Sequence, residues 1–219
     1  MTPRDALHQK ARHFFDTLWR RGDPWELETT EFEQRRYEQQ LRLVADRDYA
    51  LALEIGCGAG AFTQLLPKLA ERIVALDVAP SAITRAREKT MSSAAIDFRV
   101  ANVMEYDPVR EGPWDLVILS ETIYYLGWLY SFFDVAWLAS QLFAATRLGG
   151  RLLLANTEGC MDDYLVRPWL IRTYRDLFVN VGYELMTEEI YRGIKHGVEL
   201  EVLMSLFTKS REPDPATRA

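Results

Sequence analysis

The sequence predicts an α/β fold with a doubly wound, mostly parallel seven-stranded sheet and an antiparallel C-terminal edge strand. Three observations lead to this prediction. Short apolar runs alternate with helical segments from about residue 46 onwards, which is typical of parallel strands joined by helices. Residues 56–60 place glycines at alternate positions directly after the first apolar run, and such glycines allow a sharp turn and a close approach to the backbone. Near the C-terminus, two strand-like runs flank residues 193–197, as in a hairpin.

The individual elements follow from hydrophobic periodicity and from turn residues. The predicted strands are 49–54, 72–77, 96–100, 114–119, 151–155, 183–191 and 198–207. The predicted helices are 5–21, 31–45, 61–70, 81–89, 131–147 and 168–179. Thr29 or Thr30 is the expected N-cap of the second helix, with Glu33 reaching back. Residues 148–150, Leu-Gly-Gly, are the expected C-cap of the fifth helix.

The length of 219 residues suits one domain with a full core. We expect this domain at residues 46–208, preceded by a helical segment at 1–45 and followed by a disordered tail at 209–219. The N-terminal helices could simply cover a sheet edge, or they could form a lid over a ligand. The sequence leaves these two roles equally open.

Composition excludes several classes of function. A formal net charge of −6 argues against a nucleic-acid partner, which needs clustered Lys and Arg. The N-terminus lacks the apolar region of a signal peptide, so we expect a cytoplasmic protein. Cys57 and Cys160 are far apart and lack metal-type spacing, so we expect two reduced thiols and no metal site. Residues 121–147 are strongly apolar, but the central Asp134 would cost about 2.5–3.5 kcal/mol in a bilayer. We expect a strand end, a loop and a buried helix there instead of a membrane span.

The glycine loop raises the question of which nucleotide-like cofactor it holds. Gly56, Gly58 and Ala61, followed by Asp77 at the end of the second strand, could be a dinucleotide fingerprint. Three features favour another cofactor. Glu54 stands two residues before the first glycine, where it could serve a cationic amino group. The glycines run in the order G-x-G-x-G, and the chain leaves no room for the second domain of a dehydrogenase.

The ordered motifs resemble those of class I S-adenosylmethionine (SAM) methyltransferases over residues 45–208. These motifs are residues 54–60, Asp77, Asn102, the 115–121 strand and residues 148–150. A narrower resemblance is to the NodS-like nodulation methyltransferases, which N-methylate the free amine of a deacetylated chitooligosaccharide. It depends on residues 23–25 (Asp-Pro-Trp), 32–37 (Phe-Glu-Gln-Arg-Arg-Tyr), 60–63 (Gly-Ala-Phe-Thr) and 124–126 (Tyr-Tyr-Leu).

The resemblance implies a role for each matching residue. The three glycines would let the backbone pass the methionine and ribose parts of SAM, and Glu54 would hold the amino group through water. Asp77 would accept both ribose hydroxyls, Val78 would flank the adenine, and Asn102 would meet the adenine amino group. Arg36 could pair with the SAM carboxylate or lie on the helix surface. The implied cofactor-binding residues are Trp25, Arg36, Glu54, Gly56, Gly58, Gly60, Asp77, Val78, Asn102, Val103 and Ser120.

Methyl transfer from a sulfonium is an in-line displacement, so positioning should dominate catalysis. An amine acceptor must be neutral when it attacks, and a carboxylate could take its proton. Glu121 is the first candidate for this base, with Asp162 and Asp163 next, and Tyr124 is a candidate for the acceptor pocket. The three histidines, His8, His13 and His196, lie in positions without a specific catalytic signal.

Three functions stay open at this stage: an N-methyltransferase of an amino sugar or similar amine, an O-methyltransferase of a small molecule, and a binding protein without chemistry. Residues 156–180 are where we expect the specificity for the acceptor. The apolar helix 131–147 has too many large side chains for one buried stripe, which makes it a candidate homodimer interface.

Overall fold

The computed structural model describes residues 3–90, 95–159 and 164–211. The described chain divides into two compact units, Met1–Tyr106 and Asp107–Ala219. Cys160, Asp162, Asp163 and most of the predicted tail lie outside the described residues. Lys209, the first residue of that predicted tail, is buried, and its backbone N–H donates to the carbonyl of Gly150 over 2.9 Å.

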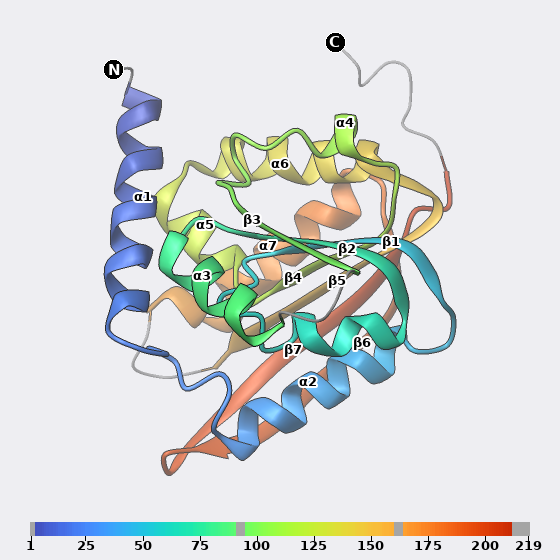
Figure 1. Ribbon diagram of the computed structural model, residues 1–219. Helices are drawn as coiled ribbons and strands as arrows, with labels where there is room; N and C mark the ends of the chain where they lie inside the picture. Colours follow the sequence, from blue (N-terminus) through green and yellow to red (C-terminus); the bar gives the residue numbers. More distant parts are fainter. Residues whose placement is uncertain (1–2, 91–94, 160–163, 212–219) are drawn as a thin grey trace. The chain divides into compact units, whose positions relative to one another are not determined.

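The first unit contains three parallel strands and the helices around them. The helices are α1 (Pro3–Arg20), α2 (Glu31–Val44), the 3-10 helix η1 (Thr63–Lys68) and α3 (Pro80–Lys89), and the strands are β1 (Tyr49–Ile55), β2 (Ala70–Asp77) and β3 (Ile96–Val100). β2 pairs in parallel with both β1 and β3. Parallel pairing aligns the carboxyl ends of these strands, where the glycine loop and Asp77 lie. In Figure 1, α1 runs alongside α3, and the two helices are in contact.

The second unit carries the rest of the sheet. Its helices are α4 (Pro108–Glu111), α5 (Ile123–Leu129), α6 (Phe132–Ala145), η2 (Tyr164–Val166) and α7 (Pro168–Asn180), and its strands are β4 (Trp114–Ser120), β5 (Thr146–Glu158), β6 (Glu184–Lys195) and β7 (Val198–Thr208). β4 and β5 are parallel. β7 is antiparallel to both β5 and β6, and the β6–β7 hairpin is the long orange-red pair in Figure 1.

The seven strands follow the order β3-β2-β1-β4-β5-β7-β6, which confirms the predicted fold class. The C-terminal strand β7 is the antiparallel one, and it lies between β5 and β6, so β6 forms the edge. This order arises because a tight turn makes β6 and β7 neighbours, while the last strand still pairs with β5 over eight residues.

Two predicted helices are shorter than their sequence pattern indicates. The segment 61–70 forms only the 3-10 helix η1, because Pro67 lies inside it and Ala70 already begins β2. The predicted helix 131–147 ends at Ala145. Thr146 begins β5, and Gly149 donates its N–H to Lys209 over 2.7 Å, so residues 148–150 belong to the strand instead of a helix cap.

The helix caps also differ from the prediction. Thr30 precedes α2 as expected, but its side chain makes no capping hydrogen bond within the described chain; its hydroxyl donates to the carbonyl of Glu26. Glu33 pairs instead with Arg36. A complete capping box occurs at α6, where Ser131 and Asp134 bond reciprocally.

The apolar stretch 121–147 divides into α5 and α6, with a break at residues 130 and 131. None of the helices that the structure describes has both the length and the apolar character of a membrane span. Val135, Leu138 and Leu142 of α6 are buried, as expected for a helix whose one face packs into a core.

Candidate functional site

Asp77 organises the glycine loop of the first unit. It ends β2, and its two carboxylate oxygens accept hydrogen bonds from two backbone N–H groups. Oδ2 accepts from Gly58 over 2.9 Å, and Oδ1 accepts from Ala79 over 2.8 Å. A carboxylate offers about four acceptor positions, so Asp77 can hold the loop and still accept hydroxyl donors from a ligand. Burial raises the pKa of Asp77 to about 6, although the bonds from Ala79, Gly58 and Val78 oppose this.

The loop itself requires glycine. Gly56, Gly58 and Gly60 all have φ between 55° and 78°, in the left-handed region that favours glycine. A Cβ atom on Gly58 would also lie 2.7 Å from the ring of Trp19. The close approach of backbone and neighbouring side chains therefore leaves no room for a larger residue at this position.

Glu54 is a buried carboxylate that lacks a full set of partners. It is 3% exposed, and its Oε2 atom has no hydrogen-bond partner among the described residues. Burial raises its pKa to about 7; the nearby Thr63 hydroxyl lowers it and the Asp77 carboxylate raises it further. Thr63 Oγ1 likewise lacks a hydrogen bond of ordinary geometry within the described ranges. A buried acid in this state is suited to a cationic or hydrogen-bonding ligand.

Val78 and Asn102 line a pocket with a volume of about 540 Å³ in the same unit. The amide of Asn102 is held from both sides. Its Oδ1 accepts from the Met104 N–H over 3.0 Å, and its Nδ2 lies 2.9 Å from Nδ1 of His8 on α1. Val103, the next residue, is buried in the core. The structure thus brings His8, which the sequence did not single out, to the predicted residue Asn102.

Arg36 is buried, which excludes the exposed position on the helix surface, one of the two alternatives that the sequence left open. It is 2% exposed and forms an ion pair of 2.5 Å with Glu33, one turn away on α2. Its guanidinium also lies 5.0 Å from the ring centroid of Tyr37, which stacks on Phe62 of the glycine-loop segment. Arg36 and Glu33 therefore form a buried ion pair on α2, next to the Tyr37 ring that stacks on the segment after the glycine loop.

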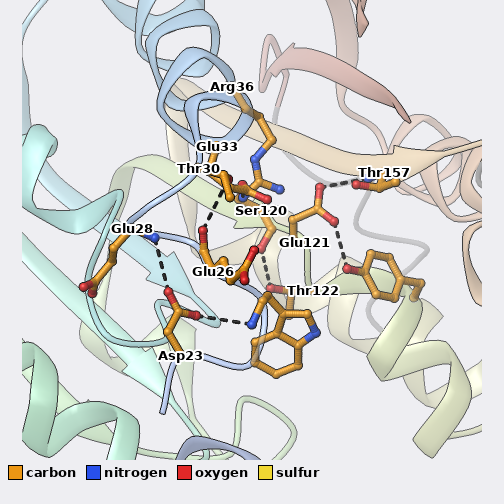
Figure 2. A network of polar contacts seen from close by, with 12 residues as sticks. Asp23, Glu26, Glu28, Thr30, Glu33, Arg36, Ser120, Glu121, Thr122 and Thr157 are labelled. Carbon is orange, nitrogen blue, oxygen red and sulfur yellow. Dashed lines mark hydrogen bonds and ion pairs between the residues drawn. The ribbon is translucent and has the colours of Figure 1, made fainter. Parts of the chain in front are cut away.

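Trp25 lies in an aromatic cluster with Phe15 and Trp19 of α1. Asp23 shapes the turn before it by accepting from the backbone N–H groups of Trp25 and Glu28 (Figure 2). The Asp-Pro-Trp motif thus connects α1 to the segment before α2. Asp16 of α1 attaches this helix to α3, because its carboxylate accepts from the N–H of Ser81 at the start of α3.

In the second unit, Glu121 follows β4 in a strained conformation. Its φ is 52°, which non-glycine residues rarely adopt outside functional or tightly constrained sites. Its Oε1 accepts from the Thr157 N–H over 2.9 Å, as Figure 2 shows. Its Oε2 accepts from the Tyr124 hydroxyl over 2.8 Å. The predicted pair Glu121 and Tyr124 is therefore in direct contact.

Two buried polar residues of β5, Asn156 and Glu158, were not predicted. Asn156 is fully buried, and its Oδ1 accepts from the N–H groups of Thr122 and Ile123, which caps α5 from the adjacent strand. Glu158 is 1% exposed and pairs with Arg172 of α7 over 2.6 Å. No local sequence pattern predicts that residues of β5 contact α5 or α7, so these contacts become visible only in the folded structure. Ser120 precedes Glu121, and its hydroxyl has no hydrogen-bond partner among the described residues.

Comparison with known proteins identifies the family. Residues 9–132 match the family described as Nodulation protein S (NodS). The chain belongs to the NodS family. It is 43% identical over 105 residues to Nodulation protein S of Bradyrhizobium diazoefficiens, which covers 48% of this chain and 49% of that protein. It is 41% identical over 106 residues to Nodulation protein S of Rhizobium tropici, covering 48% and 44%. The chain thus spans about half the length of the curated NodS relatives that it matches.

The fold agrees with this membership. The crystal structure of N-methyltransferase NodS from Bradyrhizobium japonicum, in complex with S-adenosyl-L-homocysteine, matches with a TM-score of 0.78. That match covers 92% of this chain and 99% of the other at 23% identity, so it supports the NodS fold. The resemblance noted from the sequence motifs is therefore confirmed.

Proposed function

We propose that this NodS-family protein is a SAM-dependent methyltransferase that N-methylates the free amine of an amino sugar or chitooligosaccharide-like molecule. The observation that carries the proposal is the pair of carboxylates, Glu54 and Asp77, around the glycine loop. A buried acid with an unsatisfied oxygen and a second acid that holds two loop N–H groups suit a ligand with an ammonium and ribose hydroxyls. The family match over residues 9–132 includes this whole region.

The residues of the first unit fit the cofactor. Glu54 and Asp77 would hold its amino group and ribose, Val78 and Asn102 would line its base, and Gly56, Gly58 and Gly60 give room along the backbone. Trp25, Arg36, Val103 and Ser120 stay predicted contacts of the cofactor, and Trp25 also packs against the cluster that contains Ala59 of the loop. When bound, SAM supplies an electrophilic methyl group on a positively charged sulfur. Binding such a cation also compensates the buried negative charge of Glu54.

The second unit would supply the residues for the acceptor. An attacking amine has to lose a proton. The Tyr124 oxygen can accept a hydrogen bond from the amine while its own hydrogen points to Glu121. Tyr124 would then receive the proton from nitrogen and pass its own to the Glu121 carboxylate. The Thr157 N–H keeps that carboxylate in place.

The likeness to curated O-methyltransferases motivates the alternative acceptor. The chain is 31% identical over 75 residues to a ubiquinone biosynthesis O-methyltransferase of Xanthomonas campestris, covering 34% of this chain and 31% of that protein. That short match does not identify the methyl acceptor, because it covers only about a third of either protein. Methyl transfer to a hydroxyl oxygen is therefore one of the outcomes that the test distinguishes.

Two measurements test the proposal. Calorimetry should show binding of S-adenosyl-L-homocysteine to the wild type and a loss of at least tenfold in Asp77→Ala. Asp97→Ala, an exposed acid on β3, is the matched control and should bind normally. Transfer from labelled SAM should then reach glucosamine oligomers with a free amine and not fully N-acetylated ones. Transfer only to hydroxyl acceptors would support the O-methyltransferase. If S-adenosyl-L-homocysteine does not bind to the wild type, both the N-methyltransferase and the O-methyltransferase are refuted.

We also propose a homodimer through α6 and a cytoplasmic location. Phe132, Phe133 and Trp137 of α6 are between 45% and 82% exposed, which supports an apolar contact surface. Cys57 is a free, buried thiol, as in proteins of reducing compartments. Sedimentation at high concentration tests the dimer, and Phe133→Asp should convert a dimer to a monomer.

A further inference from the structure

The pocket in the first unit has a wall that the strands do not supply. Four of its lining residues, Asp5, His8, Gln9 and Arg12, come from α1, and Val78 and Asn102 come from the segments after β2 and β3. The volume of about 540 Å³ is within the range of small-molecule sites. A helix near the N-terminus therefore closes the part of the site where the purine base of the proposed cofactor would lie.

The orientation of the Asn102 amide can be assigned from its partners. Only the oxygen can accept from the Met104 N–H, so Oδ1 faces that group and Nδ2 faces His8. Because the amide nitrogen only donates, Nδ1 of His8 has to accept, and the imidazole proton is on Nε2. His8 is 8% exposed, so this contact is largely shielded from water. His8 and Met104 together prevent the amide from turning over.

We propose that His8 is a positioning residue for purine recognition, which acts by fixing the amide of Asn102. The inference rests on the proposed function, since it assigns part of the same cofactor site. An adenine edge presents an amino donor beside a ring-nitrogen acceptor, whereas a hypoxanthine edge presents an oxygen in place of the amino group. An amide held with its oxygen and nitrogen in known places discriminates between these edges. An amide that can rotate by 180° can bind the adenine edge or the hypoxanthine edge.

The other end of α1 is attached independently of His8. Ser81 N–H donates to Asp16 Oδ1 over 2.9 Å, and the Ser81 hydroxyl donates to the Asp16 carbonyl over 3.2 Å. Trp19 packs with Ala59, Ala79 and Ala82. Changing His8 should therefore leave α1 on the unit, so that an effect on binding can be attributed to the pocket.

The test compares S-adenosyl-L-homocysteine with its hypoxanthine analogue, S-inosyl-L-homocysteine, by calorimetry. In His8→Ala the adenine compound should bind about tenfold more weakly, as expected when a buried donor loses its partner. The ratio of the two affinities should fall towards one. In His8→Asn the side-chain oxygen replaces Nδ1 as the acceptor, so most of the ratio should return. His13→Ala, an exposed histidine of the same helix, should match the wild type.

Each outcome decides the proposal. An unchanged ratio in His8→Ala, or equal loss in His8→Asn and His8→Ala, overturns the role of His8 and leaves the proposed function intact. A wild type that binds neither compound overturns both. If His8→Ala does not fold, His8→Leu decides in its place, because leucine keeps most of the side-chain volume and offers no acceptor to the Asn102 amide. A ratio that falls towards one in His8→Leu supports the role of His8, and an unchanged ratio overturns it.

Discussion

Glu54 should make the folded protein less stable at neutral pH than it would be with a neutral side chain. Burial raises the Glu54 pKa from 4.5 to about 7, so the folded protein binds this proton more tightly than the unfolded chain does. A group with a raised acid pKa favours folding below about pH 4.5, and this contribution is lost as the pH rises towards 7. The contribution of Glu54 to the free energy of unfolding therefore changes by about 3 kcal/mol in full, since each pKa unit corresponds to about 1.36 kcal/mol.

The substitution Glu54→Gln removes the titration and keeps the side-chain volume. Relative to the wild type, its free energy of unfolding should increase by about 2.5 kcal/mol between pH 5 and pH 8. For a chain of this size, that corresponds to about 5–10 °C in the midpoint of thermal unfolding. Urea unfolding at both pH values measures the difference directly.

The same substitution should weaken binding of S-adenosyl-L-homocysteine at pH 8, because the ionised acid is what attracts its amino group. In the wild type the affinity should rise between pH 6 and pH 8. In Glu54→Gln only the rise in affinity near pH 6 should remain, because Asp77 has a pKa of about 6. Glu71→Gln, an exposed acid on β2, is the control. If the stability difference is the same at pH 5 and pH 8, Glu54 does not have a raised pKa in the folded protein.

Three further predictions concern hydrogen bonds that the fold creates. Tyr124→Phe should lower the rate of amine methylation about 10- to 100-fold without weakening cofactor binding; an unchanged rate in a transfer assay would remove Tyr124 from the chemistry. Asn156→Ala should destabilise the protein by about 1–3 kcal/mol, because it removes the oxygen that accepts from the N–H groups at the start of α5. Urea unfolding measures this loss. Asp16→Ala should cost about 1 kcal/mol through the lost cap of α3, whereas a change below 0.3 kcal/mol would mean that water replaces it.

Much of the site could be predicted because its residues follow strands directly in the chain. Glu54, the glycines, Asp77 and Asn102 each stand at a strand end, and parallel strands bring such ends to one edge. Glu121 and Tyr124 are three residues apart, so their contact is within reach of a short helix. His8, Asp16 and Asn156 could not be predicted. Their partners lie 94, 65 and 34 residues away, and no local pattern encodes such pairings.

The sequence by itself determined the fold class, the glycine loop and the acids on either side of it. These depend on hydrophobic period and on backbone angles that only glycine adopts without strain, and both are local properties of the chain. Only the tertiary structure decided that Arg36 is buried, that 61–70 is a short 3-10 helix and that β7 lies inside the sheet edge. It also decided that α1 brings a histidine to the predicted purine pocket. Burial and long-range hydrogen bonds arise from packing between distant segments, and the local pattern around Val78 and Asn102 does not encode that α1 lines the pocket beside them.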